Sequence, residues 1–219
     1  MKSRLLSPAV LAATCLAACS SSTVASAAAF VNGSFETATV DPGSSFSTLS
    51  NGSTAITGWT VGGDSVDYIG GYWQPQNGGR SLDLSGNANG SVSQTFSTVV
   101  GQSYAVNFFL AGNPDGGLGD KTATVSATGA SSQNFIFTVT PSDSKGGMGW
   151  ASYTYDFTAT STDTTLKFAS ATGTAYGPAL DNVSVAAVPE PAIWVMMLTG
   201  FAGVGVMLRR RRAALAAAG

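Results

Sequence analysis

The sequence predicts an all-β protein, an antiparallel β-sandwich or jelly roll, flanked by an N-terminal signal peptide and a C-terminal transmembrane helix. Three observations support this. Apolar and polar residues alternate in short stretches, Asn-Gly pairs separate several of them, and residues 30–187 show no helical period. Alternation marks strands with one buried face, and Asn-Gly is a strong hairpin signal. Many short strands divided by turns are typical of sandwiches and jelly rolls.

Residues 1–29 are typical of an export signal. Lys2 and Arg4 form a positive start, a mostly apolar stretch follows, and A-S-A at residues 25–27 is a candidate cleavage site. We therefore expect the domain that follows to be exported.

Cys19 offers an alternative to that cleavage site. L-A-A-C at residues 16–19 resembles the lipobox of bacterial lipoproteins, in which the cysteine becomes the lipidated first residue. A lipid there would be largely redundant with a second anchor at the other end of the chain. Both cysteines lie in this segment and the chain has no histidine, so the domain has no disulfide, no thiol nucleophile and no histidine base.

The central domain, residues 30–187, should contain ten strands. The expected strands are residues 54–61, 65–69, 81–85, 91–97, 103–111, 121–128, 134–140, 150–159, 164–170 and 179–186. In the fifth, SYAVNFFLA, every second residue is large and apolar, which indicates one buried face. Trp59 belongs to such an alternating stretch and is expected in the core.

The charge of the domain argues against nucleic acid as a partner. Between Phe30 and Val188 there are four basic and eleven acidic residues, which leaves a net charge of −7. Such a surface repels phosphate backbones. Ten of the eleven acids are aspartates, which favour turns.

The C-terminal segment is predicted to span a membrane before processing. Residues 192–208 carry no charge, and at about 1.5 Å per residue these 17 residues reach roughly 26 Å, at the short end for a span. Pro191 suits the first turn of a helix. Arg209, Arg210, Arg211 and Arg212 should remain cytoplasmic with the tail, residues 213–219.

Val188, Pro189, Glu190 and Pro191, followed by this span and the four arginines, resemble the PEP-CTERM sorting signal, over residues 188–212. One departure is that Ile193 follows Ala192 where that pattern commonly has Ser or Thr. The resemblance implies a Gram-negative protein that is transiently held in the inner membrane, processed by an exosortase, and delivered to the cell surface or extracellular matrix.

A second resemblance covers the domain itself. The motifs NGSFE, ITGW, VDYI, GGRSLDLSG, SVSQTF, LAGNPDGG and GPALDNVSV occur in that order between residues 32 and 185. They resemble the choice-of-anchor C family, which is close to domain-of-unknown-function family 642 and to the galactose-binding-like jelly rolls. The resemblance implies a galactose-binding-like sandwich with an alternative C-terminal anchor, and it defines no biochemical activity.

The same resemblance implies a structural calcium site, because the first and last strands of such jelly rolls run close together and often each supply a carboxylate. The candidates are Glu36 and Asp181, with backbone carbonyls as further ligands. The alternative is that Glu36 caps a turn and Asp181 accepts hydrogen bonds from backbone amides.

The stretch DYIGGYWQPQNGGR, residues 67–80, is the candidate ligand site. It gathers Tyr72, Trp73, Gln74 and Arg80 in a glycine-rich loop. Aromatic faces beside amide and guanidinium groups suit sugars. The glycines imply a loop that could display Trp73, and the alternative is that Tyr68 and Trp73 belong to the core.

We therefore expect an exported, noncatalytic surface protein that binds or organises extracellular polysaccharide. A structural matrix or adhesion protein without a sugar site is the alternative. A carbohydrate-active enzyme is the third hypothesis, with Asp64 and Asp67, or Asp115 and Asp120, as the candidate catalytic carboxylates. These aspartates are also ordinary turn residues.

Overall fold

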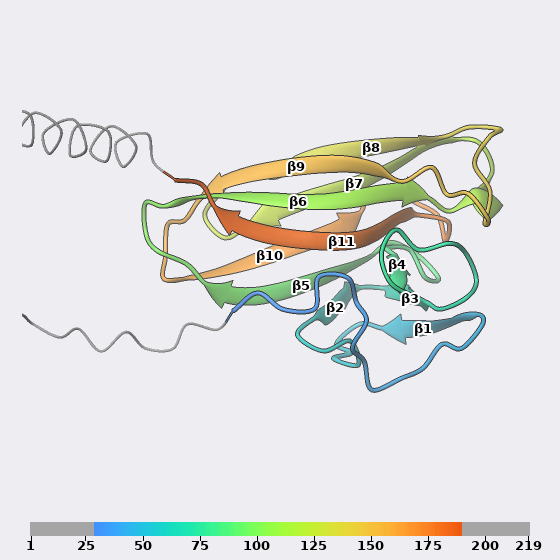
Figure 1. The fold of residues 1–219 in the computed structure, drawn as a ribbon, viewed down its shortest axis with the longest axis horizontal. Coiled ribbons are helices and arrows are strands. Elements are labelled where there is room, and N and C mark those ends of the chain that lie inside the picture. The colour runs from blue at the N-terminus through green and yellow to red at the C-terminus, as the bar shows by residue number, and fades with distance from the viewer. Residues whose placement is uncertain (1–28, 190–219) are drawn as a thin grey trace, which may run out of the picture.

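Eleven strands form two antiparallel sheets in the part of the chain that the computed structural model describes, residues 29–189. One sheet has the order β1-β3-β4-β11-β6-β9 and the other β2-β5-β10-β7-β8, which makes a jelly-roll-like sandwich (Figure 1). The strands are β1 (Phe46–Ser50), β2 (Thr60–Gly63), β3 (Ser65–Ile69), β4 (Ser81–Asp83), β5 (Gly90–Ser97), β6 (Ser103–Gly112), β7 (Gly119–Ala127), β8 (Gln133–Val139), β9 (Ala151–Thr158), β10 (Asp163–Ser170) and β11 (Pro178–Ala187). A short 3₁₀ turn, η1 (Pro114–Gly116), follows β6.

The core lies between the sheets and is built from the alternation seen in the sequence. In β6 the side chains of Tyr104, Val106, Phe108 and Leu110 are buried, as predicted. Phe108 packs edge-to-face on Phe168 of β10 across the two sheets, with ring centroids 5.1 Å apart. The prediction for Trp59 is also confirmed, because it is buried and its indole N–H donates to the Asn32 carbonyl at 2.9 Å.

Nine of the ten expected strands are present, and the first is largely wrong. Residues 54–59 form no named strand, although Ile56 makes an isolated bridge to Ala38. The strand that begins the six-stranded sheet is β1, which the sequence did not reveal. Its residues FSTLS are mostly polar because β1 is an edge strand with much of its surface exposed.

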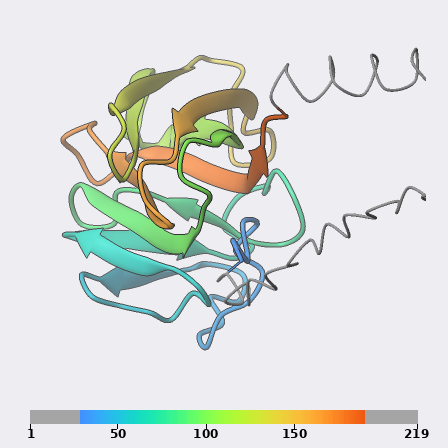
Figure 2. The same cartoon turned by 90° about the vertical axis from the view of Figure 1, so that its left-hand side faces the viewer.

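Both ends of the described chain lie at one end of the sandwich. The Phe30 ring packs on Phe96, near the end of β5, with centroids 5.6 Å apart. The Val188 amide donates to the Ser103 carbonyl at the start of β6, at 2.8 Å. This end is on the left in Figure 1 and faces the viewer in Figure 2. At about 3.4 Å per residue, the ten residues of β6 carry the chain roughly 34 Å to the opposite end.

Within residues 29–189, no helix is long and apolar enough to cross a membrane. The expected span, residues 192–208, lies outside the described residues. So do Glu190, Pro191, the four C-terminal arginines, Cys19 and nearly all of the expected signal peptide.

Candidate functional site

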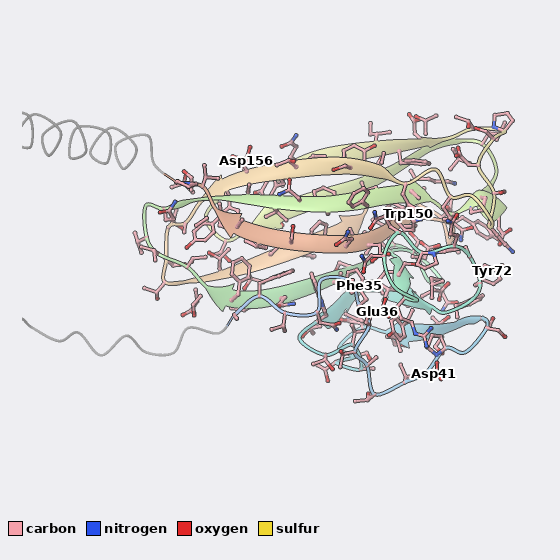
Figure 3. The ribbon with its side chains drawn as sticks, in the orientation of Figure 1. Phe35, Glu36, Asp41, Tyr72, Trp150 and Asp156 are labelled. Carbon is pink, nitrogen blue, oxygen red and sulfur yellow. The ribbon has the colours of Figure 1, made fainter. Side chains whose placement is uncertain are left out.

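A cleft of about 170 Å³ lies on the part of the six-stranded sheet formed by β1 and β3, towards the end remote from the chain termini. Strand pairing places Phe46 opposite Ile69 and Thr48 opposite Asp67, so these four side chains share one face. Three loops complete the cleft. The remaining lining residues are Tyr72, Trp73, Gly86, Asn87, Asn113, Asp115, Ala175 and Tyr176. Figure 3 shows Tyr72 at this end and Asp156 towards the other.

Asp67 provides the buried polar group of the cleft. Its Oδ1 accepts the Thr48 hydroxyl at 2.6 Å, whereas Oδ2 receives no donor from residues 29–189. Burial raises the pKa of Asp67, and the hydrogen bond from Thr48 opposes that rise. Asp67 can therefore still accept one or two hydrogen bonds from a ligand.

Two aromatic rings at the cleft are partly open to solvent. Phe46 is 40% exposed and Tyr176 is 44% exposed, whereas every other aromatic residue between residues 29 and 189 is buried or half-buried. The Tyr176 hydroxyl and the Asn87 side-chain amide make no hydrogen bond to any described residue. Rings of this kind can stack on the C–H faces of a sugar while free polar groups bond its hydroxyls.

Tyr72 forms a wall of the cleft, and both its ring and its hydroxyl already contact other side chains. Its ring packs edge-to-face on Phe46 at 5.0 Å, and its hydroxyl donates to Asp115 Oδ2 at 2.5 Å. Lys145 Nζ lies 3.9 Å from the Tyr72 ring centroid and 2.9 Å from the same carboxylate oxygen. Burial alone would raise the pKa of Asp115, but these hydrogen bonds and the Lys145 charge outweigh it and lower that pKa.

A buried carboxylate behind the cleft connects two of its loops. Asp83 Oδ2 accepts Asn113 Nδ2 at 2.7 Å, and Oδ1 accepts the Gly177 amide at 3.1 Å. Asn113 Oδ1 in turn accepts the Asp115 amide at 2.9 Å. Burial raises the pKa of Asp83 to about 7, although the hydrogen bonds from Ser85, Asn113 and Gly177 oppose the rise. Asp83 therefore holds the loops that carry Asp115 and Tyr176.

Of the four predicted ligand residues, Tyr72 and Trp73 line the cleft, but Trp73 is not displayed as expected. Its side chain is only 4% exposed, and its indole N–H donates to Ser81 Oγ at 2.8 Å. Trp73 packs into the core because a large ring next to the sheet gains more from burial than from solvent. The structure therefore does not display Trp73, and the alternative that Tyr68 and Trp73 belong to the core is confirmed.

Gln74 and Arg80 lie outside the cleft lining. The Gln74 carbonyl accepts the Trp150 indole N–H at 3.0 Å, and its side chain is exposed. The Arg80 guanidinium pairs with Asp41 at 2.9 Å. The glycine-rich loop thus contributes Tyr72 and Trp73 to the cleft but not Gln74 or Arg80.

Glu36 and Asp181 are brought to the same loop, residues 76–80. Asp181 Oδ2 accepts the amides of Gln76 and Asn77, each at 2.9 Å. Glu36 Oε1 accepts those of Gly79 and Arg80 at 2.9 and 3.0 Å. Gly78 is required here, because a Cβ would lie 2.3 Å from Glu36 Oε1 and its φ is 63°.

These hydrogen bonds bear directly on the expected calcium site. Asp181 Oδ1 also accepts the Asn182 amide at 2.6 Å, so N–H groups satisfy three of the four carboxylate oxygens. Burial raises the pKa of Asp181 to about 7, and the charge of Glu36 adds to the rise. Residues 29–189 contain no cluster of three or more acidic, cysteine or histidine ligands. N–H groups therefore hold the loop in this structure, and calcium at Glu36 and Asp181 stays a prediction, since an ion would have to displace some of these contacts.

The carboxylate pairs expected for an enzyme are arranged differently. Asp64 accepts the Ser65 hydroxyl and Asp120 accepts the Thr138 hydroxyl, and neither lines the cleft. Asp67 and Asp115 do line it together, although they come from distant parts of the chain.

A larger hollow of about 470 Å³ lies between the edge strands β8 and β9 at the end where β6 begins. Its lining includes Ser103, Ser131, Ser132, Gln133, Tyr155, Asp156 and Phe157. The rings of Tyr155 and Phe157 are buried in the core, and the Tyr155 hydroxyl is bonded to the Ser131 carbonyl at 2.8 Å. This hollow therefore offers no free aromatic face, and the smaller cleft is the better candidate.

Several cleft residues were not identified from the sequence, namely Phe46, Thr48, Asn87, Asn113 and Tyr176. Two of them had a usable signal. Asn113 belongs to LAGNPDGG, and Tyr176 directly precedes GPALDNVSV.

Halomucin from Haloquadratum walsbyi (strain DSM 16790 / HBSQ001) is 36% identical over 171 residues, which cover 73% of this chain and 2% of halomucin. The chain thus spans about 2% of the length of this curated relative. Among solved structures, TmCBM61 in complex with β-1,4-galactotriose is 18% identical with a TM-score of 0.44, covering 60% of this chain and 90% of that one. A family 35 carbohydrate-binding module from Clostridium thermocellum is 11% identical with a TM-score of 0.43, covering 65% and 99%.

The resemblance of the domain motifs to domain-of-unknown-function family 642 is confirmed by a match over residues 28–186. This range contains every residue that lines the cleft and both sheets of the sandwich except Ala187, the last residue of β11. The chain belongs to the family described as Protein of unknown function (DUF642).

Proposed function

We propose that this chain is an exported, noncatalytic surface protein whose sandwich binds extracellular polysaccharide through the cleft. One observation carries the proposal. The partly exposed rings of Phe46 and Tyr176 share a single cleft with polar groups that have no partner among residues 29–189, the Asp67 Oδ2 atom and the Asn87 amide. Rings with free donors and acceptors beside them match the alternating C–H and O–H surface of a sugar.

The state of Asp115 favours binding over hydrolysis. A glycosidase needs two carboxylates that are free to act on opposite sides of the scissile bond. Asp115 Oδ2 is held by both the Tyr72 hydroxyl and the Lys145 ammonium, which leaves it poorly placed as a nucleophile or base. We therefore assign Asp67 and Asp115 to recognition.

We further propose that the chain is a choice-of-anchor C protein with a galactose-binding-like sandwich and a PEP-CTERM sorting signal, and that an exosortase processes it in the inner membrane of a Gram-negative bacterium. The position of Val188 supports this arrangement, because it lies at the end of the sandwich remote from the cleft. A membrane anchor beyond Val188 leaves the cleft facing away from the bilayer. Lipidation of Cys19 and a structural calcium at Glu36 and Asp181 remain additional proposals.

The test is saccharide binding by the full chain, purified in detergent, on a glycan array and by calorimetry. Phe46→Ala and Tyr176→Ala should each weaken binding by at least about tenfold, equivalent to roughly 1.4 kcal/mol. Ile136→Ala is the matched control, because Ile136 is 50% exposed on β8 and lies outside the cleft.

Three results would contradict the proposal in different ways. Binding that survives both aromatic substitutions would remove the cleft as the site. Self-association without any saccharide binding would favour the structural matrix or adhesion protein. Hydrolysis of a polysaccharide that is lost in Asp67→Asn would favour the enzyme.

A further inference from the structure

The charged side chains that line the cleft are all acidic. They are Asp67 and Asp115, and neither a lysine nor an arginine is among the lining residues. A third carboxylate, Asp83, lies behind Asp67, directly opposite it across the β3–β4 pair. Lys145 pairs with Asp115 and offsets its charge, so Asp67 is the lining carboxylate that no cation pairs with.

The described cations near the cleft are already engaged. Lys145 is bound to Asp115 and lies over the Tyr72 ring. Lys121 is buried, and its ammonium points at the Gly116 carbonyl at 3.4 Å. Arg80 is paired with Asp41 and lies outside the cleft lining. An acidic ligand would find no unpaired cation among these three side chains.

The size of the cleft limits the ligand further. Sites for drug-sized molecules typically enclose about 300–1,000 Å³, whereas this cleft encloses about 170 Å³. Such a volume suits a single sugar ring. The Asp67 Oδ2 atom can accept a hydrogen bond from a sugar hydroxyl, and the Asn87 amide can donate one to a ring or hydroxyl oxygen.

We propose that the cleft selects one uncharged sugar unit of a polysaccharide and rejects the corresponding uronate. This inference rests on the proposed function and adds the ligand class. A carboxylate at C6 of a bound sugar would share this small, partly dry cleft with the unpaired Asp67 carboxylate, and like charges repel more strongly there than in water. A hydroxymethyl group at C6 carries no such penalty.

The experiment compares matched pairs of polymers that differ in the oxidation of C6, namely galactan with polygalacturonate and mannan with polymannuronate. Binding to the full chain in detergent is measured by calorimetry, with calcium and with chelator. We expect a neutral polymer to bind at least about tenfold more tightly than its uronate partner.

Asp115→Asn provides the mechanistic control. It removes one negative charge from the cleft and releases Lys145, so the preference for the neutral polymer should fall at least about threefold. Asp156→Asn makes the same change of charge at an exposed position of β9, in the lining of the larger hollow near the opposite end (Figure 3), and should leave the preference unchanged.

The possible results separate the failure of this inference from the failure of the proposed function. A uronate that binds as well as its neutral partner, in either buffer, overturns the inference while the proposed function stands. Equal effects of Asp115→Asn and Asp156→Asn would also overturn it, since selectivity would not then depend on cleft charge. Failure of every polymer to bind overturns the proposed function and the inference together.

Discussion

The side chains of Asp83 and Asn113 form a buried hydrogen bond of 2.7 Å that joins strand β4 to the loop after β6. The same carboxylate accepts the Gly177 amide, and Asn113 caps the turn that carries Asp115. Gly177 has no room for a side chain, because a Cβ would lie 2.4 Å from Ser85 Oγ. The geometry of the cleft therefore depends on Asp83, which is not among the residues that line the cleft.

Asp83→Asn should disorganise the cleft. Both oxygens of Asp83 accept N–H groups, so the new amide nitrogen would face a donor in either orientation, and a flip of Asn113 would cost the hydrogen bond to the Asp115 amide. We expect saccharide affinity to fall at least tenfold and the free energy of unfolding to fall by about 1–3 kcal/mol. Calorimetry and urea unfolding measure the two effects. Asp156→Asn is the control, and equal behaviour of the two variants would refute the positioning role.

The stability of the protein should depend on pH through its buried acids. Burial raises the pKa of both Asp83 and Asp181 from 3.8 to about 7, and also raises that of Asp67. Between roughly pH 4 and 7 the folded state therefore binds more protons than the unfolded state, so the free energy of unfolding falls as pH rises. In chelator we expect a higher Tm at pH 5 than at pH 8, with a smaller difference in Asp83→Asn. A Tm that rises across this range would contradict the assignment.

Calcium can be tested at the loop of residues 76–80. If it binds Glu36 and Asp181, it replaces protons on Asp181 and therefore stabilises the folded state more at pH 8 than at pH 5. We expect calcium to raise the Tm at pH 8 and Glu36→Gln to abolish this rise. A Tm unmoved by calcium or chelator would remove the ion and leave the backbone amides as the partners of these carboxylates.

Trp73→Ala separates packing from recognition. Because the ring is buried and its N–H is bonded to Ser81, we expect a loss of about 3–5 kcal/mol in the free energy of unfolding. Gln74→Ala, one position along and exposed, should cost less than about 0.5 kcal/mol. Urea denaturation measures both values. A Trp73→Ala variant of near wild-type stability would restore the view of Trp73 as a displayed ligand contact.

Mass spectrometry of the protein from cells tests the two ends of the chain. We expect an N-terminus near residue 28 and a C-terminus near Pro189–Pro191, as export and exosortase processing require. A lipidated N-terminal Cys19 would support the lipoprotein alternative. Retention of residues 192–219 in the mature protein would contradict processing.

The fold was accessible from the sequence because its core follows a period of two. Strand β6 shows this clearly, with Phe108 and Leu110 buried and Asn107 exposed. Strand β1 was missed because its polar residues are those of an edge, and edges show little alternation. The alternation of apolar and polar residues therefore predicts interior strands better than edge strands.

The site was less accessible, because the cleft is assembled from separate segments. Phe46 meets Ile69 through the pairing of β1 with β3, and Tyr176 approaches the Asn113 loop through the pairing of β11 with β6. Neither neighbour is visible in local sequence. The sequence also did not show that Trp73 is buried and Tyr72 half-buried, since the residue type of an aromatic side chain does not determine its burial. The Glu36 and Asp181 carboxylates were correctly expected to lie near each other, since both bind the same loop.

The shared position of Phe30 and Val188 at one end of the sandwich has a consequence for assemblies of such domains. In a polypeptide that contains several such domains in tandem, the linkers would all join the domains at this end, because the first and last described residues of each domain lie there. The domains would then project side by side from the linkers. Every cleft would then point outward. If each cleft bound one sugar unit with low affinity, several clefts would bind a long polymer with high avidity, since each further cleft binds within an existing complex.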